Sequence, residues 1–238
     1  MSTDLTVGVA SENSGVIENE DAKLIGSIVT KMLNGTYTRE EIRRFDNRQN
    51  PFVCGRLSRK EREAWERFYG EELGLAVDVS RVTVPDNPGG FDRVIVVTQD
   101  VTIKMVLDAC RRYFPVWTYT EDLDAVVAEN ERTTTGGSYA IRVRDRVEAD
   151  EELKGRSAAL VAQQLLATMT LLERLIYELK YFKETKKHLD MSNVTLATGS
   201  RDRGGSVPGV RWGDDGLGVG WCLVQSANDN RRARQVVS

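Results

Sequence analysis

Few residues of this 238-residue chain have the types and spacing that catalysis requires. The three cysteines, Cys54, Cys110 and Cys222, form no CxxC pair. The single histidine, His188, follows a lysine-rich stretch, where we expect it to cap helix carbonyls or to be solvated. No GxxxxGK[ST] or GxGxxG motif follows a predicted strand, and HExxH and GxSxG are absent. We therefore expect no catalytic residue and no cofactor.

Several acidic and amide side chains near the C-terminus supply enough oxygens for a calcium ion. They are Asp202, Asp214, Asp215, Asp229 and Asn230. However, their spacing is not that of an EF-hand loop, and no terminal glutamate follows. Acidic residues between short strands usually belong to turns. We therefore expect no resident metal ion at these residues.

The most informative sequence pattern is an alternation of apolar and small or polar residues, with a period of two, near the C-terminus. An apolar row of period two consists of Val210, Trp212, Leu217, Val219 and Trp221. The residues between them are Gly209, Arg211, Gly213, Gly218, Gly220 and Cys222. Glycine on the wet face of a strand loses backbone entropy and packs against nothing. Either this face is free to vary, or its glycines mark bulges, bends or a close approach of another backbone.

Helical and strand patterns predict an α+β protein that positions this segment. Helices are predicted for residues 22–33, after Thr38, from Ser58 to Gly70 or Gly74, and for 100–114, 121–129, 157–167 and 170–189. Strands are predicted for residues 77–84, 91–97 and 138–147, with several short strands after 193. Capping boxes at Ser58 and Thr170 support two of the helix starts. A Pro-Asp-Asn-Pro-Gly-Gly turn at 85–90 suggests a helical N-terminal module, 1–88, and a second domain, 89–238.

Composition excludes several classes of function. The formal net charge of −3 gives no general attraction to nucleic acids, although a nucleic-acid-binding N-terminal module remains an alternative. No apolar run reaches the ~20 residues that a membrane-spanning helix requires. The first residues, MSTDLTVGVASENSG, lack the pattern of a secretory signal. We therefore expect a cytoplasmic or virion-associated protein without membrane partners.

The C-terminal segment resembles the variable region of target proteins of diversity-generating retroelements, above all those of candidate-phylum bacteria, small archaea and their viruses. The similarity rests on NVTLATGSR at 193–201, on VPxVxW at 207–212, on LxVxW at 217–221 and on RARQVVS at 232–238. It covers about residues 92–238. The resemblance implies a C-type-lectin-like domain related to formylglycine-generating enzymes, with a variable region at about 193–238. It also implies that an error-prone reverse transcriptase rewrites this region by miscopying adenines.

The residues between the apolar positions agree with that mechanism. AAY codons altered at their adenines encode Asn, Asp, Gly, Ser, Arg and Cys among others, but not Trp, Lys, Glu, Gln or Met. The positions assigned to the variable, ligand-binding face are Asp202, Arg203, Ser206, Gly209, Arg211, Gly213, Asp214, Asp215, Gly218, Gly220, Cys222, Asn228, Asp229 and Asn230. Trp212 and Trp221 fall outside the allowed set and belong to the scaffold. Gln225 departs from the pattern, and the ligand motifs of calcium-dependent lectins are missing.

We therefore predict a ligand-binding protein without catalytic activity, which recognises an unidentified protein or small polar molecule through its variable face. Two alternatives remain open. The first is an enzyme of the same fold, which would need a convergent polar pocket around Cys222 or His188. The second is a structural component of a phage or cell surface, for which the domain serves only assembly.

Overall fold

Strands from distant parts of the chain build the main sheet. The computed structural model describes residues 29–30 and 55–238. The sheet contains β4 (Val116–Thr118), β7 (Val194–Leu196), β9 (Val207–Gly213), β10 (Gly216–Cys222) and β11 (Arg231–Ala233), in the order β11-β7-β9-β10-β4. β4 is parallel to β10 and β11 is parallel to β7, whereas β9 is antiparallel to both neighbours. This mixed sheet and the accompanying helices confirm the α+β class.

In the described part of the chain, three antiparallel ribbons accompany the sheet. They are β1 (Gly55–Arg56) with β2 (Thr83–Val84), β3 (Arg93–Val97) with β6 (Tyr139–Val143), and β5 (Val127–Asn130) with β8 (Ser200–Asp202). The strands predicted at 91–97 and 138–147 are confirmed as β3 and β6 within shorter bounds. The strand predicted at 77–84 is wrong for most of its length. This segment instead forms a turn, in which the Asp78 carboxylate accepts a hydrogen bond of 2.8 Å from the Ser80 amide.

Reciprocal capping boxes begin the two longest described helices. The helices are α3 (Arg59–Leu73), α4 (Ile103–Arg111), α5 (Leu123–Val126), α6 (Ala158–Gln163) and α7 (Leu171–Thr185), with short 3-10 turns η1 (Thr134–Gly136) and η2 (Glu151–Leu153). Ser58 caps α3 with Glu61, and Thr170 caps α7 with Glu173, which confirms both predicted starts. α3 ends at Leu73, and its C-cap is Gly74, one of the two predicted ends. α7 ends at Thr185, earlier than predicted, because its C-cap Lys186 is left-handed with φ 60°.

Two shorter helical predictions are partly wrong, and others fall outside the described residues. Residues 121–129 contain only the four residues of α5 before the chain extends into β5, which pairs with β8. The helix predicted at 157–167 ends at Gln163, since Leu165 takes a left-handed conformation with φ 52°. The helix predicted at 22–33 is described only at residues 29–30, where it is helical, and the one after Thr38 lies outside the described residues.

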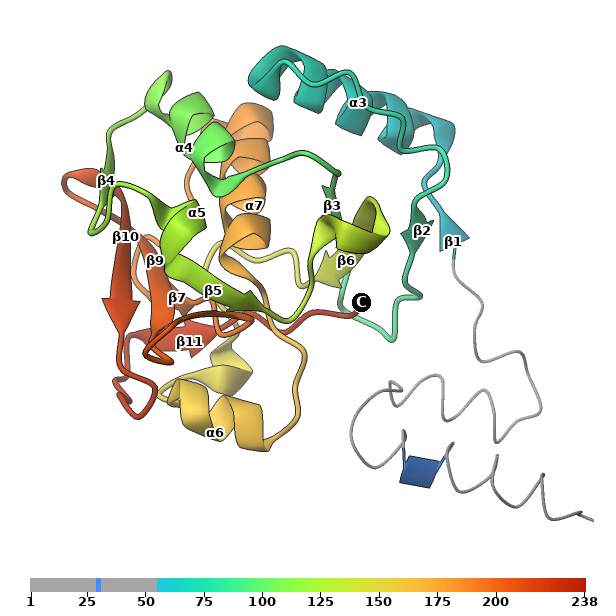
Figure 1. Cartoon of the computed structure of the whole chain (residues 1–238). Coiled ribbons are helices and arrows are strands. Elements are labelled where there is room, and N and C mark those ends of the chain that lie inside the picture. Colours follow the sequence, from blue (N-terminus) through green and yellow to red (C-terminus); the bar gives the residue numbers. More distant parts are fainter. Residues whose placement is uncertain (1–28, 31–54) are drawn as a thin grey trace, which may run out of the picture.

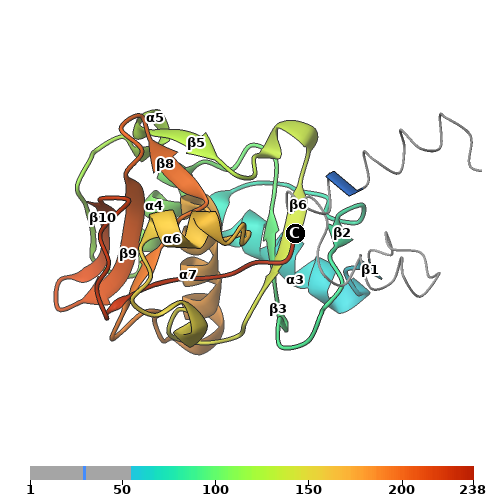
Figure 2. The ribbon, with the colours of Figure 1, turned by 90° about the horizontal axis from the view of Figure 1, so that it is seen from below.

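A large hydrophobic core joins most of these elements, and two smaller clusters of described residues lie around α6. Figures 1 and 2 show α7 between the five-stranded sheet and the β3–β6 ribbon, with α4 beside it. Leu175 and Ile176 of α7 are fully buried in the core. The core continues across the proposed domain boundary at 88/89, because Trp65 and Tyr69 of α3 belong to it. Tyr69 also donates a 2.7 Å hydrogen bond to the carbonyl of Val96.

No described helix combines the length and the apolar character needed to span a bilayer.

A candidate ligand-binding groove

The β9–β10 hairpin separates an apolar face from a glycine-rich face. Its antiparallel register pairs Val210 with Val219 and Trp212 with Leu217. Val210, Leu217 and Val219 are at most 1% exposed, whereas Trp212 and Trp221 are half-buried and pack against the same core. Because strand side chains alternate between faces, the residues between them lie on the opposite side. Val210, Trp212, Leu217 and Val219 of the predicted apolar row therefore face the core, whereas Trp221, predicted as scaffold, also lines the groove.

The opposite side of the hairpin is hollowed into a groove of about 390 Å³. It is lined by Trp117, Val194, Gly209, Arg211, Gly213, Asp214, Asp215, Gly216, Gly218, Gly220, Trp221, Cys222, Asn228, Asn230 and Arg231. Of the 14 positions assigned from the sequence to the ligand-binding face, ten are in this set; the other four are Asp202, Arg203, Ser206 and Asp229. Residues from β4, β9, β10 and the loop before β11 thus surround one concave surface.

The remaining four positions lie outside the groove. The Asp202 carboxylate accepts a 2.8 Å hydrogen bond from the Ser206 amide, and the Asp202 amide donates to the Ser206 carbonyl. These bonds close the turn between β8 and β9, with Arg203 exposed at its tip. Asp229 is exposed beside Gly155. Asp202 and Ser206 therefore shape a turn.

The groove glycines differ in the room they leave for a side chain. A Cβ atom at Gly218 would have no neighbour closer than 3.9 Å, and one at Gly220 none closer than 4.0 Å. At Gly209 it would lie 3.0 Å from Sγ of Cys222 and 3.2 Å from Cγ1 of Val194. Gly216 has φ +101°, and its Cβ would lie 2.3 Å from the Pro115 carbonyl oxygen. Gly216 is therefore a structural glycine and Gly209 is a tight one, whereas Gly218 and Gly220 are open positions.

Most polar side chains around the groove serve no local structural purpose in the described part of the chain, although Arg231 donates a hydrogen bond to the Ser226 hydroxyl. In that part of the chain, the side chains of Arg211, Asp214, Asp215, Asn228 and Asn230 make no hydrogen bond or ion pair.

In other turns of the described chain, side chains of this kind accept hydrogen bonds from backbone amides. Asn87 accepts hydrogen bonds from the amides of Gly89 and Phe91, and Asp124 accepts from those of Ile103 and Lys104. A bound molecule would therefore find the polar groups of the groove available.

Five lining residues were not assigned to the ligand-binding face from the sequence, namely Val194, Gly216, Trp221, Arg231 and Trp117. Among these five, only Trp117 is exposed. It lies on the edge strand β4, opposite Gly218 in the parallel register, and is 54% exposed. A Cβ at Gly218 or Gly220 would lie 4.0 Å from its six-membered ring. Tyr119, which is 72% exposed, meets it edge-on with centroids 6.1 Å apart. Alternating Val-Trp-Thr-Tyr residues are the local signal for this strand, but not for its pairing with β10.

Neither the candidate nucleophile, Cys222, nor the candidate base, His188, is activated in the groove. Burial raises the pKa of the Cys222 thiol, so that it stays protonated at neutral pH. His188 is not a groove residue. Its ring stacks on Trp212 and Phe182, and its Nδ1 lies 2.9 Å from Oε1 of Glu178. The expectation that His188 is solvated or caps a helix is therefore wrong, because this ring is packed beneath the core face of the hairpin.

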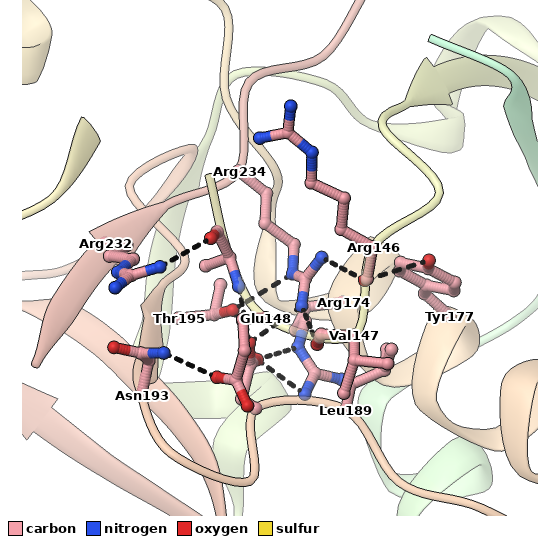
Figure 3. Close-up of polar contacts among 12 residues, drawn as sticks. Arg146, Val147, Glu148, Arg174, Tyr177, Leu189, Asn193, Thr195, Arg232 and Arg234 are labelled. Atoms are coloured by element: carbon pink, nitrogen blue, oxygen red, sulfur yellow. Dashed lines mark hydrogen bonds and ion pairs between the residues drawn. The ribbon is translucent and has the colours of Figure 1, made fainter. Parts of the chain in front are cut away.

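A buried ionic network underlies the hairpin. Figure 3 shows Arg174, Arg234 and Thr195 pointing toward one another. They meet at Asp190, which accepts 2.9 and 2.8 Å hydrogen bonds from Arg174, a 2.7 Å bond from Arg234 and another from the Thr195 hydroxyl. The backbone carbonyl of Asp190 accepts from the Trp212 amide at 3.1 Å. The network therefore joins α7, β7, β9 and the C-terminal segment.

A resident metal has no evident ligand set: within residues 29–30 and 55–238, no three His, Cys, Asp or Glu side chains gather closely enough to hold an ion. Comparisons with protein-family models, curated proteins and solved structures found no match to this chain.

Proposed function

We propose that this protein binds a ligand in the β9–β10 groove and that a retroelement diversifies the groove residues. The observation that carries the proposal is the convergence of ten sequence-assigned positions on one concave surface. The intervening residues Val210, Leu217 and Val219 are buried. Changes at the open positions would leave the core intact, since isolated surface substitutions usually alter stability by no more than about 0.5 kcal/mol.

We further propose that residues 89–238 form a C-type-lectin-like domain. The supporting features are the mixed sheet, the C-terminal hairpin at its centre and the helix α7 packed beside it. The sequence resemblance is what distinguishes this fold from other α+β arrangements, because fold class alone does not specify a function.

Recognition is a better account of the groove than catalysis. An enzyme needs a nucleophile with a base, or paired acids, within reach of one reacting atom. The Cys222 thiol has its pKa raised by burial, and His188 is engaged with Glu178 and Trp212 away from the groove lining. The unpartnered groove side chains of the described chain are instead suited to hydrogen bonds with a ligand.

The decisive experiment is deep sequencing of the 3′ end of this gene, with its flanking DNA, across a natural population. We expect substitutions confined to AAY codons at open groove positions such as Arg211, Gly218 and Gly220, beside a near-identical template and a reverse-transcriptase gene. Codons for Val210 and Gly216 are the matched controls and should not vary. Uniform sequence without a template, or equal variation at the control codons, would refute the diversified-binding proposal.

A further inference from the structure

An exposed aromatic pair extends the groove beyond the segment proposed to vary. Trp117 and Tyr119 are exposed by 54% and 72%, whereas Trp65 is buried and Trp212 and Trp221 are half-buried against the core, with Trp221 also lining the groove. Single exposed apolar residues are common on protein surfaces. Trp117, however, lines a concave site and contacts a second exposed aromatic ring. Rigid aromatic residues of this kind are the typical anchors of binding surfaces.

We propose that Trp117 is a fixed contact of the groove and that the groove receives a protein loop which packs an apolar side chain against this indole. This inference rests on the proposed function, because it assigns the class of partner to the same site. Trp117 precedes the variable region, 193–238, so every diversified copy would retain it. Position 218 would then determine how much of the indole a partner reaches.

The charges of the groove favour a protein over a polyanion. Arg211 and Arg231 supply two positive charges, and Asp214 and Asp215 supply two negative charges. A phosphate-rich partner would require an excess of cations, whose neutralisation of phosphates dominates nucleic-acid affinity. Mixed donors and acceptors instead match a polypeptide, whose backbone offers both N–H and C=O groups.

The residue types and the open glycine positions of the groove favour the same partner. Aromatic anchors surrounded by Gly, Asn and other small polar residues characterise the binding surfaces of antibodies. The open positions Gly218 and Gly220 let a partner backbone approach the strand. A protruding loop meets these conditions, and a flat protein surface does not.

The test uses a displayed library of disulfide-constrained random peptides, selected on the full chain. We expect the selected peptides to share an aromatic or large aliphatic residue, and we expect Trp117→Ala to weaken their binding about tenfold or more. Met191→Ala is the matched control, since Met191 is 55% exposed and outside the groove, and should leave affinity unchanged. Circular dichroism of each variant verifies folding.

A second variant tests the indole without removing it. Gly218→Leu has room for its Cβ and would place its side chain beside Trp117. We expect it to weaken peptide binding and to reduce acrylamide quenching of the protein fluorescence, to which the most exposed of the four tryptophans contributes strongly.

The outcomes separate this inference from the proposed function. If Arg211→Ala weakens the peptides but Trp117→Ala does not, the groove binds ligands and the aromatic anchor is refuted. Peptides that are insensitive to every groove substitution would refute the proposed function as well. Enrichment of no peptide, or Trp117-dependent binding of an oligosaccharide or nucleotide in place of peptides, would refute the protein-loop partner.

Discussion

Alanine at three glycines of one hairpin should give three different stabilities. Gly218→Ala adds a Cβ with no neighbour closer than 3.9 Å, so reduced entropy of the unfolded chain should stabilise the protein by up to about 0.5 kcal/mol. Gly209→Ala brings a Cβ to 3.0 Å from Cys222 and should cost about 1 kcal/mol. Gly216→Ala combines φ +101° with a 2.3 Å approach to Pro115 and should cost about 3 kcal/mol or more.

Urea unfolding monitored by far-ultraviolet circular dichroism measures all three free energies of unfolding. In thermal scans, each kcal/mol corresponds to about 2–4 °C for a chain of this size. A Cys222→Ala background supplies the control, because removing Sγ should reduce the cost of Gly209→Ala and leave that of Gly216→Ala unchanged. Equal costs at the three positions would refute the distinction between open, tight and structural glycines.

Three further predictions concern the scaffold and the thiol. Asp190→Asn should cost about 3 kcal/mol at neutral pH, because it leaves the buried Arg234 without its carboxylate and Arg174 with Glu178 alone, as urea unfolding will measure. Burial raises the pKa of Asp190, but Arg234 and Arg174 outweigh burial and hold the pKa below its usual value. The wild type should therefore lose the stabilisation that this carboxylate provides as the pH falls below about 4, whereas Asp190→Asn should not show this loss. Alkylation of Cys222 by iodoacetamide, followed by peptide mass spectrometry, should be slow at pH 7 and rise steeply only above the pKa of an ordinary thiol; rapid reaction at pH 7 would contradict a protonated thiol. Thr170→Ala should destabilise the protein by about 1 kcal/mol or more, and by more than Ser58→Ala, because the capping box at Thr170 is buried and the one at Ser58 is exposed. Equal losses of stability in urea unfolding would contradict this reason.

The sequence predicts well those features that depend on neighbouring residues. Both capping boxes are hydrogen bonds across three residues, so Ser58 and Thr170 identify the starts of α3 and α7. The alternation of Val210, Leu217 and Val219 predicts which side of the hairpin is buried, because strand side chains alternate. Six of the residues that line the groove, Gly209, Arg211, Gly213, Gly218, Gly220 and Cys222, follow from the same alternation.

Features that depend on distant contacts escape such prediction. Trp117 enters the groove through the pairing of β4 with β10, which lies about one hundred residues further along the chain. His188 follows a lysine-rich helix end, yet its ring is stacked on Trp212 because α7 ends early and the chain turns back under the hairpin. Neither contact has a local signal.

The buried network explains how a face rich in glycine can be maintained without contributions from its own side chains. Asp190 contacts Arg174, Arg234 and Thr195 through its carboxylate and holds Trp212 through its backbone carbonyl. The hairpin is thereby fixed from its core side, through an arrangement that is costly to break because removing one partner leaves buried charges unpaired. The open positions on the other side contribute few contacts to the core, so substitutions there should change binding more than folding. Separation of this kind is what a surface diversified by a retroelement would require.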